Sequence, residues 1–187
     1  MTDSIPKLAA NLLANGIRFQ YLKRTGRPGR PQAISLEVTH RCIAKCIMCN
    51  IWKIPHDVPE LSVDEWLRFL SADNFFFFFL ELDITGGEPF IRKDLIDLFS
   101  GIASLKQKNL GKLKSIAVTT NGFLTDRILE YMEQILPILR DEDIDLVMVC
   151  AMDAIGEMHE KIRNYPKAWS HVNETIQGLK ELRERFS

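Results

Sequence analysis

Three cysteines lie close together in the sequence, and their spacing could bind a metal centre. Cys42, Cys46 and Cys49 occur as Cys-Ile-Ala-Lys-Cys-Ile-Met-Cys, whereas Cys150 stands alone. Three thiolates at this spacing can surround a compact iron–sulfur cluster, for which cysteine is the characteristic ligand. With three protein ligands, a cluster of four irons keeps one iron open to a small molecule, so it could act as a reaction centre.

Two other interpretations of the cysteines stay open. Structural zinc takes four tetrahedral ligands, commonly from two separated pairs, and His40 or His56 could complete such a site. The cysteines could also be ordinary thiols without a metal. Residues 1–20 show no secretory signal pattern, so metal or redox chemistry is expected before disulfide bonds.

Further chemistry-bearing residues follow later apolar segments. Gly86 and Gly87 would let a ligand approach the main chain, and Glu88 offers a carboxylate to a cation such as an ammonium group. Asn121 and Asp153 also come directly after apolar stretches. Taken singly, each of these segments is a common turn or helix cap. Their order along the chain suggests that they share one site.

The elements that would position these residues can be predicted from hydrophobic periodicity. Alternating or continuous apolar residues predict strands at 34–39, 80–85, 114–120 and 144–151. Apolar stripes predict helices at 4–24, from about 62, at 95–105, at 126–136 and from about 166. Ser62 and Glu65 form a capping-box pattern at the second helix, and Thr125 is the expected cap of the fourth.

This alternation predicts an α/β fold of about four strand–helix units in a curved parallel sheet. The apolar side of the first two strands would face the helices. Polar residues would line a concave interior: Ser35, Glu37, Thr39, Glu81, Asp83 and Thr85. A two-sided antiparallel sheet is the alternative. In a parallel sheet the strands' carboxyl ends meet at one edge, where ligands gather, so the segments described above would converge there.

Composition restricts the function classes. The chain has 187 residues, 46% hydrophobic and 26% charged, with a formal charge of -1. We expect a helix and basic linker at 1–31 and a core domain at 32–187. The near-neutral charge predicts no nucleic-acid partner. The longest apolar run, Phe75 to Leu80, is too short to span a membrane, so we expect a soluble, cytoplasmic protein. Its part Phe75 to Phe79 matches an aggregation-prone segment.

From Gln32 to its end the sequence resembles the radical S-adenosylmethionine (radical SAM) enzymes. The similarity is to the broad group with molybdenum-cofactor, nitrogenase-cofactor and peptide-maturation members. Cys42-x3-Cys46-x2-Cys49 resembles the family's cluster motif. Gly86-Gly87-Glu88-Pro89 resembles its motif for the amino group of S-adenosylmethionine.

The resemblance implies a [4Fe-4S] cluster held by Cys42, Cys46 and Cys49, with S-adenosylmethionine chelating the fourth iron. A reduced cluster would pass one electron to the sulfonium, which splits into methionine and a 5′-deoxyadenosyl radical that attacks a substrate. Reduced flavodoxin or ferredoxin would be the electron donor. The implied cofactor-binding residues are Met48, Gly86, Gly87, Glu88, Asn121 and Asp153.

The sequence departs from the family pattern in two places. Relatives often end the fourth strand in Ser-x-Asp, whereas this chain has Ala151-Met152-Asp153. The family's barrel has six strand–helix units and only four are predicted here, so the chain resembles a truncated (βα)6 barrel with exposed apolar edges. A non-catalytic metal- or cluster-binding remnant and a simple electron carrier remain alternative functions. The substrate is not predicted.

The sequence assigns no part of the cofactor site to Cys150, His159 or Arg163. Cys150 is expected in the core, because it lies within an apolar strand. His159 and Arg163 follow the fourth strand and resemble a stretch found there in relatives. A turn of surface helix and a substrate contact are both compatible with them.

Overall fold

The computed structural model describes residues 5–29, 31–72, 76 and 78–186. The chain divides into two compact units, Met1–Pro31 and Gln32–Ser187. The first contains helix α1 (Ile5–Thr25), which confirms the first predicted helix. Its last turn carries Lys23 and Arg24, whose positive charges suit the C-terminal end of a helix. No helix within the described ranges is long and apolar enough to cross a membrane.

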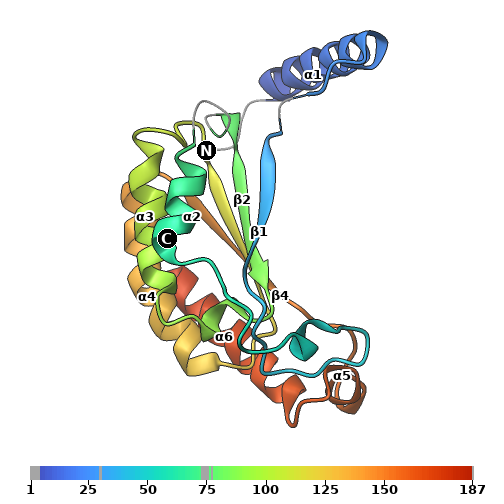
Figure 1. Ribbon diagram of the computed structural model, residues 1–187, viewed down its shortest axis with the longest axis vertical. Coiled ribbons are helices and arrows are strands. Elements are labelled where there is room, and N and C mark those ends of the chain that lie inside the picture. The colour runs from blue at the N-terminus through green and yellow to red at the C-terminus, as the bar shows by residue number, and fades with distance from the viewer. Residues whose placement is uncertain (1–4, 30, 73–75, 77, 187) are drawn as a thin grey trace. The chain divides into compact units, whose positions relative to one another are not determined.

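The second unit is built on one parallel sheet of four strands in the order β1-β2-β3-β4 (Figure 1). The strands are β1 (Ala33–Thr39), β2 (Glu81–Gly86), β3 (Ser115–Thr120) and β4 (Asp145–Cys150). Leu36 pairs with Ile84, which in turn pairs with Val118. The predicted α/β class and all four strands are therefore confirmed, and the antiparallel alternative is wrong.

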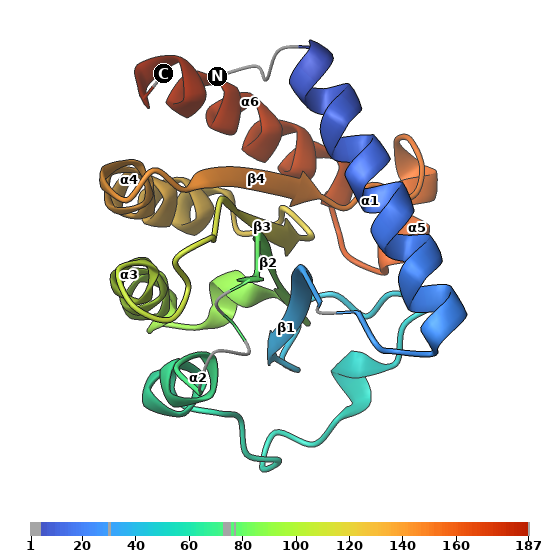
Figure 2. The same cartoon turned by 90° about the horizontal axis from the view of Figure 1, so that it is seen from above.

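Four helices cover one side of this sheet. They are α2 (Val63–Leu70), α3 (Leu95–Lys106), α4 (Thr125–Asp141) and α6 (Ala168–Phe186). Figure 2 shows them as an arc outside the strands, with α5 (Glu157–Arg163) beyond the end of β4. Two short 3-10 helices follow β1 and β2: η1 (Ile51–Lys53) and η3 (Pro89–Ile91). The arrangement leaves the other side of the sheet open within this unit, as expected for a partial barrel.

Helix caps test the finer predictions. Ser62 Oγ accepts a hydrogen bond from Glu65 N at 3.3 Å, and Glu65 Oε2 accepts one from Ser62 N at 2.8 Å, so the predicted capping box is confirmed. The predicted cap at Thr125 is wrong, because Thr125 is already the first residue of α4. Its hydroxyl instead lies 2.8 Å from that of Thr175, which links α4 to α6.

In β1 and β2 the apolar residues face the helices and the polar residues face the other side of the sheet, as predicted. Leu36, Val38, Leu82 and Ile84 are buried in the main core, on the side of the helices. On the opposite face the polar side chains of the two strands meet, and Ser35 Oγ donates a hydrogen bond to Asp83 Oδ2 at 2.8 Å. Thr39 is the exception. It is buried, because its hydroxyl binds a carboxylate described below.

The described residues of the phenylalanine run lie before β2, which begins at Glu81. Phe75 and Phe77 lie outside the described residues, but Phe76 and Phe79 are buried, and their rings stack with centroids 5.1 Å apart. Phe69 of α2 packs edge-on against Phe76. Phe76 and Phe79 therefore fill the core beneath α2, and in the folded chain they are not available for aggregation.

Candidate functional site

The cysteine loop, residues 42–49, follows β1 at the carboxyl edge of the sheet. Figure 1 shows it beside α5, and the hydrogen bond from Ile47 N to Ile162 O at 2.9 Å confirms that contact. Cys46 is buried, whereas Cys42 and Cys49 are half-buried, and all three are free thiols. The loop therefore brings three sulfur atoms to the edge where the other strand-end segments also lie.

Glu60 fixes the start of this loop, a role that the sequence analysis missed. Its Oε1 accepts hydrogen bonds from Thr39 Oγ1 at 2.6 Å and from His40 N at 3.0 Å, and its Oε2 lies 3.7 Å from Arg41 Nε. Burial acts to raise the pKa of Glu60, but these hydrogen bonds and the charge of Arg41 outweigh it and lower the pKa. Glu60 is therefore held as a carboxylate.

Trp52 fixes the other end of the loop. Its indole Nε1 donates a hydrogen bond to Cys49 O at 2.9 Å. Within the loop, Cys49 N donates to Cys46 O at 3.2 Å, which closes a tight turn between the last two cysteines. A buried tryptophan N–H normally finds a partner, so Trp52 close to the motif could have suggested this contact from the sequence.

Each of the three sulfur atoms has at least one N–H donor directed at it. Such outer-shell donors orient thiolate ligands and set the potentials of iron–sulfur clusters. The donor set therefore fits a cluster with cysteine ligands. The three pairs are Asn121 Nδ2 with Cys42 Sγ at 3.8 Å, Arg163 Nη1 with Cys46 Sγ at 3.7 Å, and Ile51 N with Cys49 Sγ at 3.5 Å.

Among the described residues, no three His, Cys, Asp or Glu side chains are close enough together to hold a single metal ion. Burial raises the pKa of the Cys42 thiol, although a hydrogen bond from the backbone of Ala44 opposes this effect. A bound metal would reverse that preference, because a coordinating thiol is deprotonated.

Gly86 and Gly87 are required by a close approach of two backbone segments. A Cβ atom at Gly86 would lie 2.1 Å from Thr39 O, and one at Gly87 would lie 2.1 Å from Arg41 O. Gly86 also has φ of 137°, a conformation that favours glycine. Gly87 N and the next N–H donate to these two carbonyl groups at 2.7 and 2.8 Å. The segment that approaches these two glycines is thus the chain's own backbone.

Glu88 is fully buried between the ends of β2 and β3. Its carboxylate accepts hydrogen bonds from Asn121 N at 2.8 Å, Thr120 Oγ1 at 2.9 Å and Phe90 N at 3.2 Å. Burial raises the pKa of Glu88 to about 7, against the opposing effect of these donors and of the positive charge of Arg163. Glu88 is thus poised to change its charge near neutral pH.

Asn121 joins the cysteine loop to the segment around Glu88. Its backbone N–H binds Glu88, its side-chain Nδ2 reaches Cys42, and its Oδ1 accepts from Phe123 N at 2.9 Å. The structure therefore brings together the first cysteine, Glu88 and Asn121, which come from the ends of three different strands.

Asp153 and Met48 do not belong to the group formed by Cys42, Glu88 and Asn121. Asp153 lies 2.6 Å from Arg163 Nε through its Oδ2 and so reaches the cysteine loop only through that arginine. Met48 is 57% exposed, and its side chain is not packed into the core. Cys150, expected in the core, is half-buried and packs against a small apolar group that includes Ala44 and Cys46. Arg163, for which both a turn of surface helix and a substrate contact were compatible with the sequence, has a side chain that is only 11% exposed.

Comparison with known proteins places the chain in a family. A family model described as "Radical SAM superfamily" matches residues 36–187. PqqA peptide cyclase of Rhodopseudomonas palustris is 44% identical over 71 residues, covering 37% of this chain and 19% of that protein. The subtilosin biosynthesis protein AlbA of Bacillus subtilis is 25% identical over 153 residues, covering 81% and 31%. A probable GTP 3′,8-cyclase of Methanocaldococcus jannaschii is 23% identical over 150 residues, covering 80% and 45%.

Solved structures share the fold. SuiB of Streptococcus suis bound to S-adenosylmethionine superposes with a TM-score of 0.61 at 19% identity, covering 98% of this chain and 38% of that chain. SuiB bound to its precursor peptide SuiA gives a TM-score of 0.60. The chain thus spans less than half the length of these relatives.

Proposed function

Because the chain belongs to the radical SAM superfamily, we propose that Cys42, Cys46 and Cys49 hold a [4Fe-4S] cluster and that S-adenosylmethionine binds beside it. One observation carries the proposal, namely that each motif sulfur has its own N–H donor while the loop is fixed at both ends. When bound, the cluster and S-adenosylmethionine would supply reductive cleavage of the sulfonium, which starts radical chemistry. The chain's residues would hold and orient them.

We propose that S-adenosylmethionine is bound by residues from the loop and from the ends of three strands. They are Met48, Gly86, Gly87, Glu88, Asn121 and Asp153. The main chain at Gly87 would contact its amino group, and the buried carboxylate of Glu88, which accepts hydrogen bonds from Thr120 and Asn121, would favour the cation by its charge. Asn121 would orient Cys42 and border the site from β3, and Asp153 would do so from the end of β4. Met48, exposed on the loop, would border the adenine, partly through its backbone.

The substrate that we propose is a peptide. Two of the relatives named above are a peptide cyclase and a bacteriocin biosynthesis protein, and SuiB has been crystallised with a precursor peptide. GTP is the competing substrate, because another relative is a probable GTP cyclase. We further propose a reduced flavodoxin or ferredoxin as electron donor and the cytoplasm as location, which suit an oxygen-sensitive cluster.

Formation of 5′-deoxyadenosine tests the proposed reaction. The chain is reconstituted with iron and sulfide without oxygen, reduced with dithionite and given S-adenosylmethionine. We expect 5′-deoxyadenosine from the wild type and from Cys150→Ala, which removes a cysteine outside the motif. Cys46→Ala should lose most of it. A cluster that is redox-active but leaves S-adenosylmethionine intact would instead favour the electron carrier. Bound zinc, or a bound cluster that shows neither redox activity nor cleavage of S-adenosylmethionine, would favour the non-catalytic remnant.

The substrate class has a separate test. Binding of GTP to the reconstituted chain is measured by equilibrium dialysis with S-adenosylmethionine present. We expect no saturable binding of GTP. Saturable binding followed by formation of a cyclised nucleotide would overturn the peptide proposal but leave the cluster assignment intact.

A further inference from the structure

Arg163 connects three parts of the site through one guanidinium group. Its Nη2 donates a hydrogen bond to Ala151 O at 2.9 Å, and its Nε lies 2.6 Å from Asp153 Oδ2. Its Nη1 is directed at Cys46 Sγ at 3.7 Å. A planar guanidinium presents its donors in a fixed fork, so the first two contacts determine where the third N–H points.

The helix that carries Arg163 is itself held firmly against the site. Ile162, the preceding residue, accepts the hydrogen bond from Ile47 N. Two neighbouring residues of α5 therefore contact two neighbouring residues of the cysteine loop. On the same helix His159 is fully buried, and its ring packs edge-on against Phe123 with centroids 6.1 Å apart. The N–H group is therefore presented to Cys46 by a fixed element.

An N–H donor at a cysteine sulfur changes the electron affinity of a cluster bound there. Reduction adds one negative charge, part of which lies on the sulfur ligands, and a hydrogen bond stabilises that charge. The positive charge of Arg163 acts in the same direction, although the carboxylate of Asp153 offsets part of it.

We propose that Arg163 is a positioning residue that fixes Cys46 and raises the reduction potential of the cluster by donating a hydrogen bond to its sulfur. This inference rests on the proposed function, because it requires a cluster on the three cysteines. Asp153 then acts on the cluster in the opposite sense, through its pairing with Arg163.

The experiment is an EPR-monitored redox titration of the reconstituted full chain without S-adenosylmethionine. Arg163→Gln removes the charge and the fork, Asp153→Asn leaves Arg163 unpaired, and Arg140→Gln serves as the control, because Arg140 is exposed on α4. Arg163→Gln should shift the reduction equilibrium about tenfold toward the oxidised cluster, which is a midpoint lower by ~59 mV. Asp153→Asn should raise the midpoint, and Arg140→Gln should not change it.

Each outcome decides between the proposals. Wild-type midpoints in both variants would overturn the role of Arg163, as would weaker binding of S-adenosylmethionine without a change in midpoint. If Arg163→Gln holds no cluster, Asp153→Asn decides, and an unchanged or lower midpoint overturns the proposal. If the wild type itself takes up no iron and sulfide, the proposed function fails instead.

Discussion

Glu88 has a buried carboxylate whose pKa is raised to about 7, because burial disfavours its charged form. In the unfolded chain the same group has an ordinary value of 4.5. Between these two values the folded chain keeps a proton that the unfolded chain releases. The stabilising contribution of the proton is therefore complete below about pH 4.5 and is lost as the pH rises through about 7.

Glu88→Gln should remove this pH dependence. We expect the wild type to lose as much as ~3 kcal/mol of unfolding free energy from this group between pH 4.5 and 7. The metal-free proteins are unfolded with urea at pH 5 and pH 8, with Glu81→Gln on the exposed start of β2 as control. The unfolding free energy of the wild type minus that of Glu88→Gln should be more positive at pH 5 than at pH 8. Parallel pH profiles would contradict the raised pKa.

Gly87 gives a second prediction at the scale of one residue. Gly87→Ala places a Cβ atom 2.1 Å from Arg41 O, which is a backbone atom and cannot move aside easily. We expect a loss of about 2 kcal/mol or more in unfolding free energy, measured by thermal denaturation. Gly16→Ala is the control, because nothing lies within 4 Å of its Cβ position. An undiminished melting temperature in Gly87→Ala would show that β1 and β2 do not approach as described.

At the scale of elements, the cysteine loop is held by residues from several parts of the chain. Glu60 binds its start, Trp52 binds its end, and α5 binds its middle. A cluster would thus bind a largely preformed loop. Such preorganisation reduces the conformational entropy that ordering the loop would cost.

Glu60→Gln should weaken this arrangement without touching a cysteine. The amide replaces one carboxylate oxygen with a donor, which would face the N–H and O–H groups of Thr39, His40 and Arg41. We expect several-fold less iron and sulfide per chain after reconstitution under limiting conditions. Asp64→Asn, on the first turn of α2, is the control for charge loss. Full iron content in Glu60→Gln would mean that the loop does not depend on this carboxylate.

Periodicity predicted the elements well, because local patterns determine them. The alternation in β1 and β2 and the capping box at Ser62 follow from side-chain direction and backbone donors within a few residues. The motif cysteines were visible for the same reason. The role of Glu60 and the contact of Arg163 with Cys46 were not predicted, because both contacts join residues far apart in the sequence and no local pattern encodes them. Thr125 was misassigned because its hydroxyl serves packing with α6, not capping.

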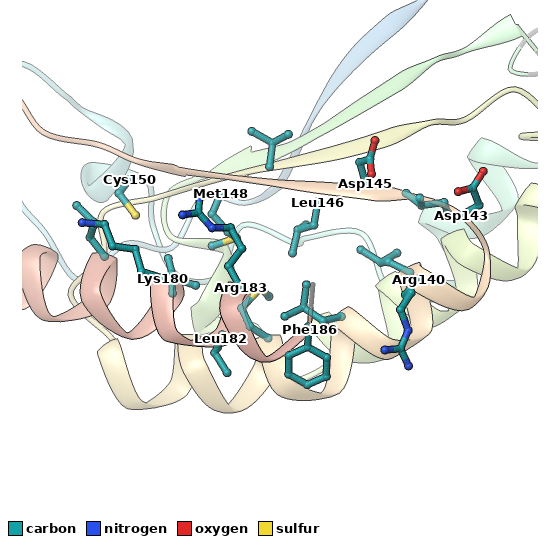
Figure 3. Close-up of a pocket in the computed structure, with 17 residues that line it drawn as sticks. Arg140, Asp143, Asp145, Leu146, Met148, Cys150, Lys180, Leu182, Arg183 and Phe186 are labelled. Carbon is teal, nitrogen blue, oxygen red and sulfur yellow. The ribbon is translucent and has the colours of Figure 1, made fainter. Parts of the chain in front are cut away.

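At the scale of the whole core unit, β4 is an edge of the sheet with apolar residues on both faces. Val147 and Val149 are 48% and 42% exposed on one face. On the other, Figure 3 shows Leu146, Met148 and Cys150 pointing toward α6. These residues line a pocket with a volume of about 780 Å³. A strand with two apolar faces is typical of a sheet interior, so this edge favours association.

Val149→Lys should reduce self-association of the chain. A lysine on an edge strand opposes pairing with another strand, since it would bury a charge. We expect a several-fold smaller associated fraction in light scattering at high protein concentration. Gln134→Lys adds the same charge on α4, away from β4, and should leave association unchanged. If both variants reduced the associated fraction equally, the net charge of the chain and not the edge strand would control self-association.

We have proposed that the motif cysteines hold an iron–sulfur cluster with one iron open to S-adenosylmethionine. The most direct test of this proposal is to analyse the anaerobically reconstituted chain for metals and to record its reduced EPR spectrum with and without S-adenosylmethionine. We expect about four irons and four sulfides per chain and a spectrum that changes when S-adenosylmethionine is added. One tetrahedral zinc per chain with no iron, and no response to S-adenosylmethionine, would contradict it.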